Sequence, residues 1–508
     1  MKRRSTTKND YEPVRRSRSL VAASKIAGRN CQIKDQCRQA TNRHSEAERR
    51  VVEDKNLIVD PMLSNSTRNG SATTFLKHGH LFSFVALFLF TLILYTRPAE
   101  FYPSPLTASI ALLVGIVTLG LFVPTQFALE GKLTASLREV KLLMLFVVTG
   151  LLSIPLAIDP MQAWTEFSGT FVRTVIIFIV IVNAVRTEMR LKALLILAIG
   201  TALWLSLGAI DDYRLGLLTV EGYRVGGRGS GIFGNSNDMA LYLVTTIPIT
   251  IAMLLSSRGP ISKLGFGACS LLMIAAVVVT YSRGGFVGLI VALSFLVWKA
   301  GHRHKSTILV VGFVIVVGFV LVAPGGYALR LASIMIPSLD PVGSADARRG
   351  ELFRSLYVAL RHPILGIGMG NYAPQMSYRG LVTHNSYTQI AAEMGIAALV
   401  CYTTFIVTPF KKLGQIARET FSSSSNSHLH YLAVGLQASL LGYLVCSFFA
   451  SVAYLWYVYY LVGYAVCLRR LYESETGREV VVEKRKTEKK HGMFDSPIIA
   501  KTSGVAPT

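Results

Sequence analysis

The sequence predicts an all-α polytopic membrane protein with about 12 transmembrane helices and a partly helical extracytoplasmic loop. Apolar runs long enough to cross about 30 Å of hydrocarbon recur through the middle of the chain. Only 16% of the residues are charged, whereas soluble proteins carry about 25%. Charged residues are concentrated in residues 1–78 and 470–508. These features exclude an ordinary soluble globular protein.

The expected spans lie near residues 80–96, 106–123, 140–158, 170–185, 191–210, 238–256, 264–281, 285–299, 307–323, 387–408, 430–449 and 452–468. Basic residues collect in alternate connections, as they do in cytoplasmic loops. They are Lys132, Arg138, Arg186, Arg190, Lys192, Arg258, Lys263, Lys299, Arg303, Lys305, Lys411, Lys412, Arg418, Arg469 and Arg470. The remaining short connections carry few basic residues, with none between Asp159 and Ser168. This bias predicts a multi-pass inner-membrane protein with both termini in the cytoplasm.

The chain divides into three predicted parts. Residues 1–78 are polar, basic and without helical periodicity, so we expect a disordered cytoplasmic tail. Residues 79–470 form the transmembrane domain, and residues 471–508 form a cytoplasmic C-terminal tail. The net charge of +23 fits basic cytoplasmic segments, and no nucleic-acid partner is expected. The six cysteines show no metal-ligand spacing, so reduced thiols are expected.

Two extracytoplasmic segments are longer than a simple connection requires. One runs from Asp211 to Asn237, and the other, the large loop, spans residues 324–384. Within the large loop, apolar residues recur at helical spacing from Arg349 to Leu360, and Pro363 follows. This pattern predicts an amphipathic helix that ends before the proline. Loops of this length in a compact protein are functional or disordered, and the apolar stripe favours a folded platform.

The first two motifs lie where expected helices begin at the extracytoplasmic side. A glycine-rich turn runs from Arg228 to Asp238 and contains Asn235 and Asn237. An ordinary helix cap would explain an asparagine there but would leave Arg228 unexplained. The second motif is Ser282-Arg283-Gly284-Gly285, which joins two spans with almost no loop. An arginine at this boundary either reaches the headgroups with its side chain or binds a ligand, and the flanking glycines allow close approach.

The third motif begins at His384 and continues into the next expected helix. Asn385, Gln389 and Glu393 are four residues apart, so they give one face of this helix a polar stripe. Lipid penalises such a stripe, which must therefore face protein or a wet cavity. An isolated histidine is usually structural. His384 follows a long loop and heads the stripe, so we favour a functional role.

The three motifs share a chemistry suited to anions. Helix N-termini present free N–H groups and the positive end of the dipole. Arg228, Arg283 and the pair Arg348-Arg349 add forked donors that match phosphate oxygens. The anion expected at a membrane boundary is a lipid phosphate or pyrophosphate. His384, titratable near neutral pH, is a candidate general base.

The order and spacing of the motifs resemble the O-antigen ligase and O-antigen polymerase superfamily. The resemblance covers about residues 80–470 and is strongest from about 225 to 400. It is carried by the stretches 228–237, 282–285, 362–370 and 384–395, together with the arginine–x₃–aromatic pattern of the loop helix. Where the family has tryptophan four residues after the loop arginine, this chain has Phe353. The doubled Arg348-Arg349 leaves two registers for that arginine.

The resemblance implies a membrane glycosyltransferase that works without a metal, cofactor or nucleotide sugar. It would move a glycan from undecaprenyl pyrophosphate to an acceptor hydroxyl, with lipid A core as the leading acceptor and membrane lipid around it. Arg228 and Arg349 match the family's pyrophosphate-binding arginines, and His384 matches its loop histidine. The expected catalytic residue is His384. The expected substrate-binding residues are Arg228, Asn235, Asn237, Arg283, Arg348, Arg349, Asn385, Gln389 and Glu393.

Several functions stay open at the sequence level. A polymerase would use a second lipid-linked glycan as the acceptor, and a protein O-oligosaccharyltransferase would use a protein. A transporter, such as an inorganic-carbon transporter, is the alternative of another class. Transporters place polar groups and broken helices near the bilayer midplane. Here the polar clusters sit at the outer helix ends, with Glu393 as the main exception, so the transferase is favoured.

Overall fold

The computed structural model describes residues 79–218, 220, 224–227, 233–300, 343–421 and 427–477, and the structural statements below refer to these residues. The predicted N-terminal tail, the expected span near 307–323 and residues 478–508 lie outside them. So does Arg228.

The described residues form helices and no strand. The helices are α2 (Leu81–Thr96), α3 (Pro98–Phe101), α4 (Pro105–Glu130), α5 (Arg138–Ser153), α6 (Pro160–Glu166), the π-helix η1 (Phe167–Phe171), α7 (Val172–Ala184), α8 (Glu188–Arg214), α9 (Ser236–Ser256), α10 (Pro260–Val279), α11 (Arg283–Ala300), α14 (Ser344–Arg361), α15 (Tyr372–Met376), α16 (Ser386–Glu419), α17 (Ser427–Cys446), the 3-10 helix η3 (Ser447–Phe449) and α18 (Trp456–Thr476). Every expected span that lies within the described residues coincides with a helix. Eight helices in the described part are long and apolar enough to cross a membrane. The protein is therefore an all-α polytopic membrane protein.

Local sequence explains where the long helices begin and end. Ser104 and Thr107 form a capping box at the start of α4, and Pro105 occupies the first helical position, where its missing N–H costs nothing. Gly131, with φ of 64°, ends the same helix in the left-handed region. Asn385 caps α16 by accepting from the N–H groups of Tyr387 and Thr388.

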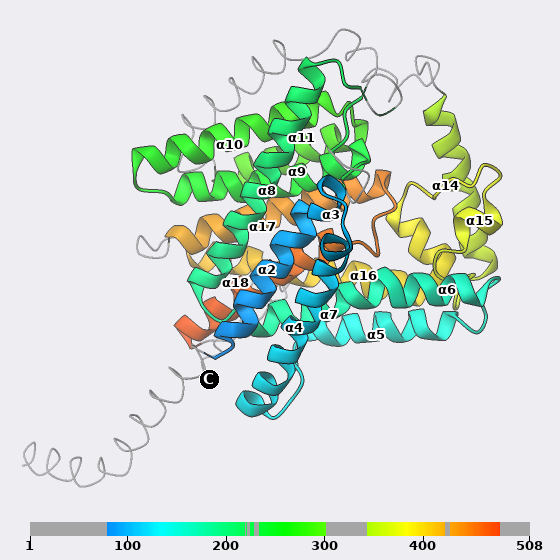
Figure 1. Ribbon diagram of the computed structural model, residues 1–508, viewed down its shortest axis with the longest axis horizontal. Coiled ribbons are helices and arrows are strands. Elements are labelled where there is room, and N and C mark those ends of the chain that lie inside the picture. The colour runs from blue at the N-terminus through cyan, green and yellow to red at the C-terminus, as the bar shows by residue number, and fades with distance from the viewer. Residues whose placement is uncertain are drawn as a thin grey trace, which may run out of the picture. The chain divides into compact units, whose positions relative to one another are not determined.

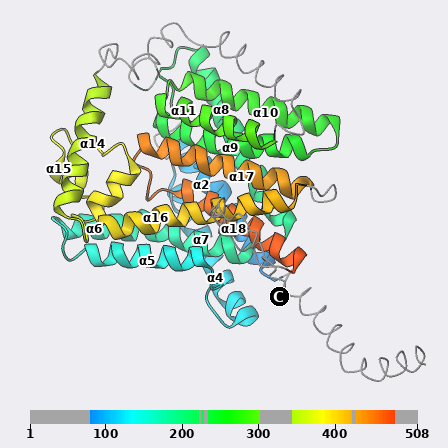
Figure 2. The same cartoon turned by 180° about the vertical axis from the view of Figure 1, so that it is seen from behind.

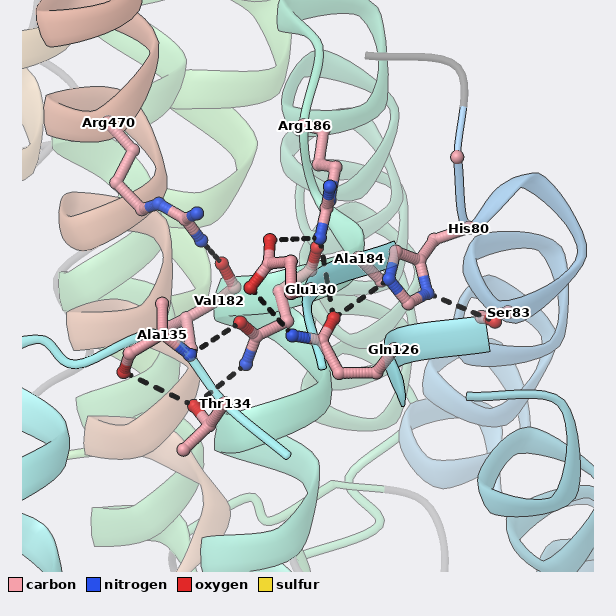
Figure 3. Close-up of polar contacts among 12 residues, drawn as sticks. His80, Ser83, Gln126, Glu130, Thr134, Ala135, Val182, Ala184, Arg186 and Arg470 are labelled. Carbon is pink, nitrogen blue, oxygen red and sulfur yellow. Dashed lines mark hydrogen bonds and ion pairs between the residues drawn. The ribbon is translucent and has the colours of Figure 1, made fainter. Parts of the chain in front are cut away.

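The connections that carry basic residues meet at one end of the bundle, called here the basic end. Arg186 pairs with Glu130 at 2.6 Å, and Arg470 donates to the Val182 carbonyl. Figure 3 shows these groups beside His80, whose ring nitrogen lies 2.9 Å from Gln126. The agreement between these contacts and the expected alternation of loops supports the predicted order of spans.

A buried ion pair ties α5 to α18 across the chain. Arg469 donates to both carboxylate oxygens of Glu139, at 2.6 and 3.2 Å. The two side chains are 4% and 0% exposed. Removing one partner of such a pair leaves an uncompensated buried charge, so we expect the pair to fix how these helices meet.

The other connections meet at the opposite end, called the loop end. The backbone N–H of Ile158, after α5, donates to the Ile367 carbonyl at 3.1 Å. The Asn371 side chain accepts from the N–H of Asp159 at 2.8 Å and donates to its carbonyl at 3.1 Å. Figures 1 and 2 show α14 and α15 at this end, beside α6 and the first turns of α16. The large loop is thus folded onto the helices, as far as its described residues show.

The predicted amphipathic helix of the large loop is confirmed as α14, which begins at Ser344. Its orientation differs from a simple amphipathic pattern, because the apolar Phe353 and Leu360 are 65% and 71% exposed. Glu351 and Ser355 are buried instead. The buried side is therefore mixed: Tyr372 donates its hydroxyl to Glu351 Oε2 at 2.8 Å, and Val358 and Ala359 pack in the same apolar cluster as the Tyr372 ring. Contacts of both kinds decide which side of α14 faces the protein.

Helix α16 is broken at Gly395, and a turn of the large loop fills the break. Gly395 has φ of 85° and ψ of 176°, so its helical hydrogen bonds are interrupted. The N–H of Ile396 donates to the Pro363 carbonyl at 2.8 Å, and the N–H of Ile367 donates to the Ala392 carbonyl at 2.9 Å. A Cβ on Gly395 would overlap the Ile364 carbonyl. Glycine is therefore required here by both backbone conformation and space.

Candidate functional site

The glycine-rich turn before α9 contains a buried arginine that the sequence motif did not include. Arg224 is 2% exposed and donates from Nε to the Thr280 carbonyl at 3.0 Å. It also donates from Nη2 to Asn237 Oδ1 at 3.0 Å. Arg224 therefore links the turn before α9 to the end of α10. The signal that could have revealed it is the pair Gly226-Gly227 just after it, where added Cβ atoms would overlap Gly234 and Phe233.

The two asparagines of this turn have different roles. Asn235 is the N-cap of α9, and its side chain accepts from the Asn237 N–H at 2.9 Å. Asn237 is not the cap, because its Oδ1 accepts from Arg224 and also from the Ser282 hydroxyl at 2.8 Å. The Ser282 hydroxyl in turn accepts from the Gly285 N–H at 3.2 Å. Asn237 thus joins the first motif to the second.

The second motif continues the chain of contacts to the region after α17. Gly284 lies against Phe449, where an added Cβ would come within 2.6 Å of the phenylalanine Cβ. The Cys446 thiol donates to the Gly284 carbonyl at 3.6 Å. Arg283, the first residue of α11, is half-buried between these contacts. The glycines therefore bring Arg283 close to the end of α17.

The third motif is held by the same region. Ser386 donates its hydroxyl to the Ala450 carbonyl at 2.7 Å and accepts from the Val452 N–H at 3.0 Å. The Thr383 and Ser451 hydroxyls lie 2.8 Å apart. Residues 446–452 therefore contact both the second and the third motif, and the three motifs form one connected cluster at the loop end.

His384 sits between the large loop and α16 in a constrained position. Its φ of 51° places it in the left-handed region, which is uncommon for a residue other than glycine or asparagine. The side chain is half-buried. Burial, with a smaller effect of the nearby Arg348 charge, lowers the pKa of the imidazole from 6.5 to about 4, and Glu351 opposes this. His384 is therefore neutral at neutral pH, whereas its usual pKa would leave part of the imidazole protonated.

The loop arginines differ in their surroundings. Arg348 is half-buried and close enough to His384 to affect the imidazole, whereas Arg349 is exposed. Arg354 donates to the Met376 carbonyl at 3.1 Å and lies 3.6 Å over the Tyr378 ring. Of the two arginines that could fill the family position, Arg348 is the one whose charge acts on the His384 imidazole.

The polar stripe of α16 does not act as one surface. Asn385 is buried as the helix cap. The Gln389 side-chain oxygen is buried and has no hydrogen-bond partner among the described residues. Glu393 is 3% exposed and accepts from the Tyr454 hydroxyl at 2.9 Å and from the Tyr372 N–H at 3.3 Å. The structure places Glu393 in an internal hydrogen-bond network, and only Gln389 keeps a free acceptor.

Glu351 and Tyr372 are further residues that the sequence motifs did not include. Glu351 is 6% exposed and accepts from the hydroxyls of Tyr372 and Ser377, at 2.8 and 3.0 Å. Ser355 donates to Thr388 at 2.9 Å, which joins α14 to α16. These contacts fix the helix that carries Arg348 relative to the helix that follows His384. In the part of the chain that the structure describes, no three His, Cys, Asp or Glu side chains are grouped as metal ligands.

Apolar helices carrying arginine, amide and imidazole groups at one end define a membrane protein with a polar site at its boundary. Residues 268–403 match the family model described as O-antigen ligase. The match contains the second and third motifs and the large loop, and it confirms the resemblance to the O-antigen ligase superfamily. The match covers residues 268–403 alone and supports an enzyme of the glycosyltransferase type, and its substrates are taken up below as a proposal. No curated protein matches the chain.

Proposed function

We propose that the protein transfers a glycan from undecaprenyl pyrophosphate to an acceptor hydroxyl, as an O-antigen ligase with lipid A core as the acceptor. The observation that carries the proposal is the contact between residues 446–452 and both Gly284 and Ser386. It gathers Arg283 and His384, with the N-termini of α11 and α16, into one cluster at the loop end. Such a cluster favours a phosphate-bearing substrate beside a general base.

The groups divide into an anion-binding set and a base. Arg283 and Arg348, with Arg228 and Arg349 as further candidates, provide forked donors for pyrophosphate oxygens. A His384 ring nitrogen accepts the proton of the acceptor hydroxyl while that oxygen attacks the anomeric carbon of the donor. The bond from that carbon to pyrophosphate breaks, and the pyrophosphate leaves with the electron pair. The arginines stabilise the charge that develops on it.

The low pKa of His384 belongs to the protein without substrate. A base with a pKa of about 4 is weak at neutral pH. A pyrophosphate bound beside it adds negative charge and offsets Arg348, so the pKa rises when the donor is present. Donor binding would thus strengthen the base where the acceptor is to react.

Four residues have a supporting role, because their side chains form hydrogen bonds with other protein groups: Arg224, Asn237, Glu351 and Glu393. Asn235 and Asn385 belong to the same supporting group, because their side chains cap α9 and α16 by accepting from backbone N–H groups of the first helical turn. Gln389, with its free buried oxygen, is the residue of the α16 stripe that we assign to substrate contact.

Transporters also contain broken helices, and in them the unpaired backbone groups at the break bind the solute. In this protein, Pro363 and Ile367 of the large loop form hydrogen bonds with the backbone groups of α16 at the break, so these groups are not available to a solute. This arrangement favours the transferase over a transporter. A polymerase shares the donor chemistry and remains the second candidate.

We further propose that the loop end faces the extracytoplasmic side of the bacterial inner membrane, with both termini in the cytoplasm. The support is the gathering of basic connections at the opposite end, as the positive-inside rule requires.

The experiment is lipopolysaccharide analysis of a deletion strain, complemented with the natural protein or with His384→Asn. Intact polymer left on its lipid carrier is the result expected for a ligase. Single repeat units attached to lipid A core would indicate a polymerase. Unchanged lipopolysaccharide and unchanged carrier-linked glycan in the deletion strain would refute both.

A further inference from the structure

A cavity of about 360 Å³ lies between the start of α4 and the helix formed by η1 and α7. Its lining combines apolar residues such as Leu94 and Trp456 with the two guanidinium groups of Arg97 and Arg173. It is separate from the cluster that contains His384, whose residues do not line it.

The cavity exists because both facing helices carry small residues at helical spacing. Ala108 and Ala111 line it from α4, and Gly169 and Thr170 line it from η1 and α7. A Cβ on Gly169 would meet nothing within 4 Å, so the cavity opens directly in front of this residue. Gly169 also lies within the π-helix Phe167–Phe171, and π-helical turns are frequent at functional sites.

The charge of the cavity favours an anion that carries a single charge. Arg97 is paired with Glu100, and its side chain is 36% exposed. Arg173 is exposed and has no hydrogen bond or ion pair with the residues that the structure describes. One carboxylate and two guanidinium groups leave a net charge of +1. That matches a phosphodiester, whereas a pyrophosphate carries more negative charge.

The surrounding helix explains why a lipid would fill this space. α4 is apolar, yet only 11% of its membrane-spanning window is buried inside the protein. It packs mainly on α2 and makes few contacts with α7. An acyl chain in the cavity would supply the missing contacts between α4 and α7, while the headgroup phosphate meets Arg173.

We propose that this cavity binds one anionic glycerophospholipid of the phosphatidylglycerol type. Its phosphodiester lies between Arg173 and Arg97, and its acyl chain lies against Ala108, Ala111 and Gly169. The lipid supports α4 and is neither donor nor acceptor of a glycan, so the inference stands apart from the proposed reaction.

The test is native mass spectrometry of the full chain in detergent, titrated with phosphatidylglycerol or phosphatidylethanolamine. We expect the natural protein to retain one phosphatidylglycerol more strongly than phosphatidylethanolamine. Losing a charged hydrogen bond of about 1.5–3 kcal/mol lowers affinity by about tenfold or more, so Arg173→Gln should show that loss. Gly169→Phe fills the cavity without changing its charge and should abolish retention.

Two variants act as controls. Arg173→Lys keeps the charge and should retain most of the binding. Arg214→Gln removes another exposed arginine, at the end of α8, and should change nothing. Equal retention of the two lipids by the natural protein would overturn the proposal. So would undiminished phosphatidylglycerol retention in Gly169→Phe, which remains informative if Arg173→Gln does not fold.

Discussion

Arg224 and Asn237 form a hydrogen bond of 3.0 Å that joins the glycine-rich turn to the first turn of α9. Asn237 accepts a second hydrogen bond from Ser282, so one side chain connects three segments of the chain. These hydrogen bonds hold polar residues from distant motifs together. Arg224 and Asn237 therefore stabilise the cluster, and we propose that other residues of the cluster bind the substrate.

Arg224→Ala should lower stability, because it leaves the Thr280 carbonyl and Asn237 Oδ1 without a buried donor. Hydrogen bonds to charged groups contribute about 1.5–3 kcal/mol, which should lower the thermal midpoint in detergent. Arg228→Ala is the matched variant four residues away. We expect it to weaken donor binding while leaving the thermal midpoint unchanged. A loss of donor binding in Arg224→Ala at full stability would reverse these two roles.

Replacing His384 should reduce turnover by about a hundredfold to ten-thousandfold, the usual contribution of a general base. Donor affinity should change little. His384→Asn is the preferred variant, because asparagine adopts the left-handed conformation that φ of 51° demands and alanine does not. The measurement is glycan transfer between lipid-linked donor and acceptor in reconstituted membranes. Near-normal turnover in a correctly folded His384→Asn protein would leave the histidine a purely structural residue.

The pH dependence of the reaction should differ between free and donor-bound enzyme. Since the pKa of His384 is about 4, kcat/KM should be flat around neutral pH and fall only as pH approaches that value. The acid limb of kcat should lie at higher pH, because bound pyrophosphate raises the pKa of the imidazole. Identical acid limbs in both profiles would show that the donor does not sit beside His384.

Stability should also respond to pH through His384. The folded pKa of about 4 lies below the ordinary 6.5, so between these values the unfolded chain binds more protons. Stability is therefore full above pH 6.5 and falls as pH drops toward 4. His80, whose pKa is also lowered to about 4, acts in the same direction. Comparing His384→Asn with the natural protein isolates the His384 share as a shallower slope of thermal midpoint against pH. Parallel slopes would contradict the assigned pKa.

Glu393→Ala should destabilise the large loop and leave binding groups intact. The substitution removes the acceptor of the Tyr454 hydroxyl and the Tyr372 N–H, and an unsatisfied buried polar group costs about 1–3 kcal/mol. Hydrogen exchange of residues 363–372 should become faster. Tyr454→Phe removes one of these bonds and should give a smaller effect. If hydrogen exchange of the loop were unchanged and donor binding were lost, Glu393 would instead be a substrate-binding residue.

Cysteine labelling tests which side of the membrane the loop end faces. Ile364 is 77% exposed at the loop end, and Lys411 is exposed on α16 toward the basic end. A membrane-impermeant maleimide should label Ile364→Cys in intact spheroplasts and Lys411→Cys only after permeabilisation. The opposite pattern would invert the orientation and move the proposed reaction to the cytoplasmic side.

The helices were predictable because hydrophobic length and basic loops are strong local signals. The same signals also predict that the connections with basic residues lie together at one end of the bundle. α14 was predictable as a helix, but the exposure of Phe353 and Leu360 was not, because the residues that contact its buried side, Tyr372 among them, lie outside the helix. Apolar periodicity in the sequence identifies one face of a helix, but it does not identify the residues that pack against that face.

The candidate site was predictable at the level of motifs and less so at the level of side chains. Asn235 and Asn237 are equivalent as cap residues in the sequence, and only the approach of Ser282 and Arg224 separates them. The spacing of Asn385, Gln389 and Glu393 predicts one polar surface. Its end is instead satisfied by Tyr454, 61 residues further along the chain. Such long-range partners leave no trace in local spacing.

The turn that fills the break at Gly395 also constrains how the protein is assembled during synthesis. Asn371 bonds to Asp159, 212 residues earlier, while Ile367 bonds to Ala392, which is made later. When the large loop has been synthesised, Asp159 is already present, but Ala392 on α16 has not yet been made. The loop can therefore form only part of its contacts until α16 has been inserted. Contacts so distant in sequence form slowly, so the loop is the part of the molecule that matures last.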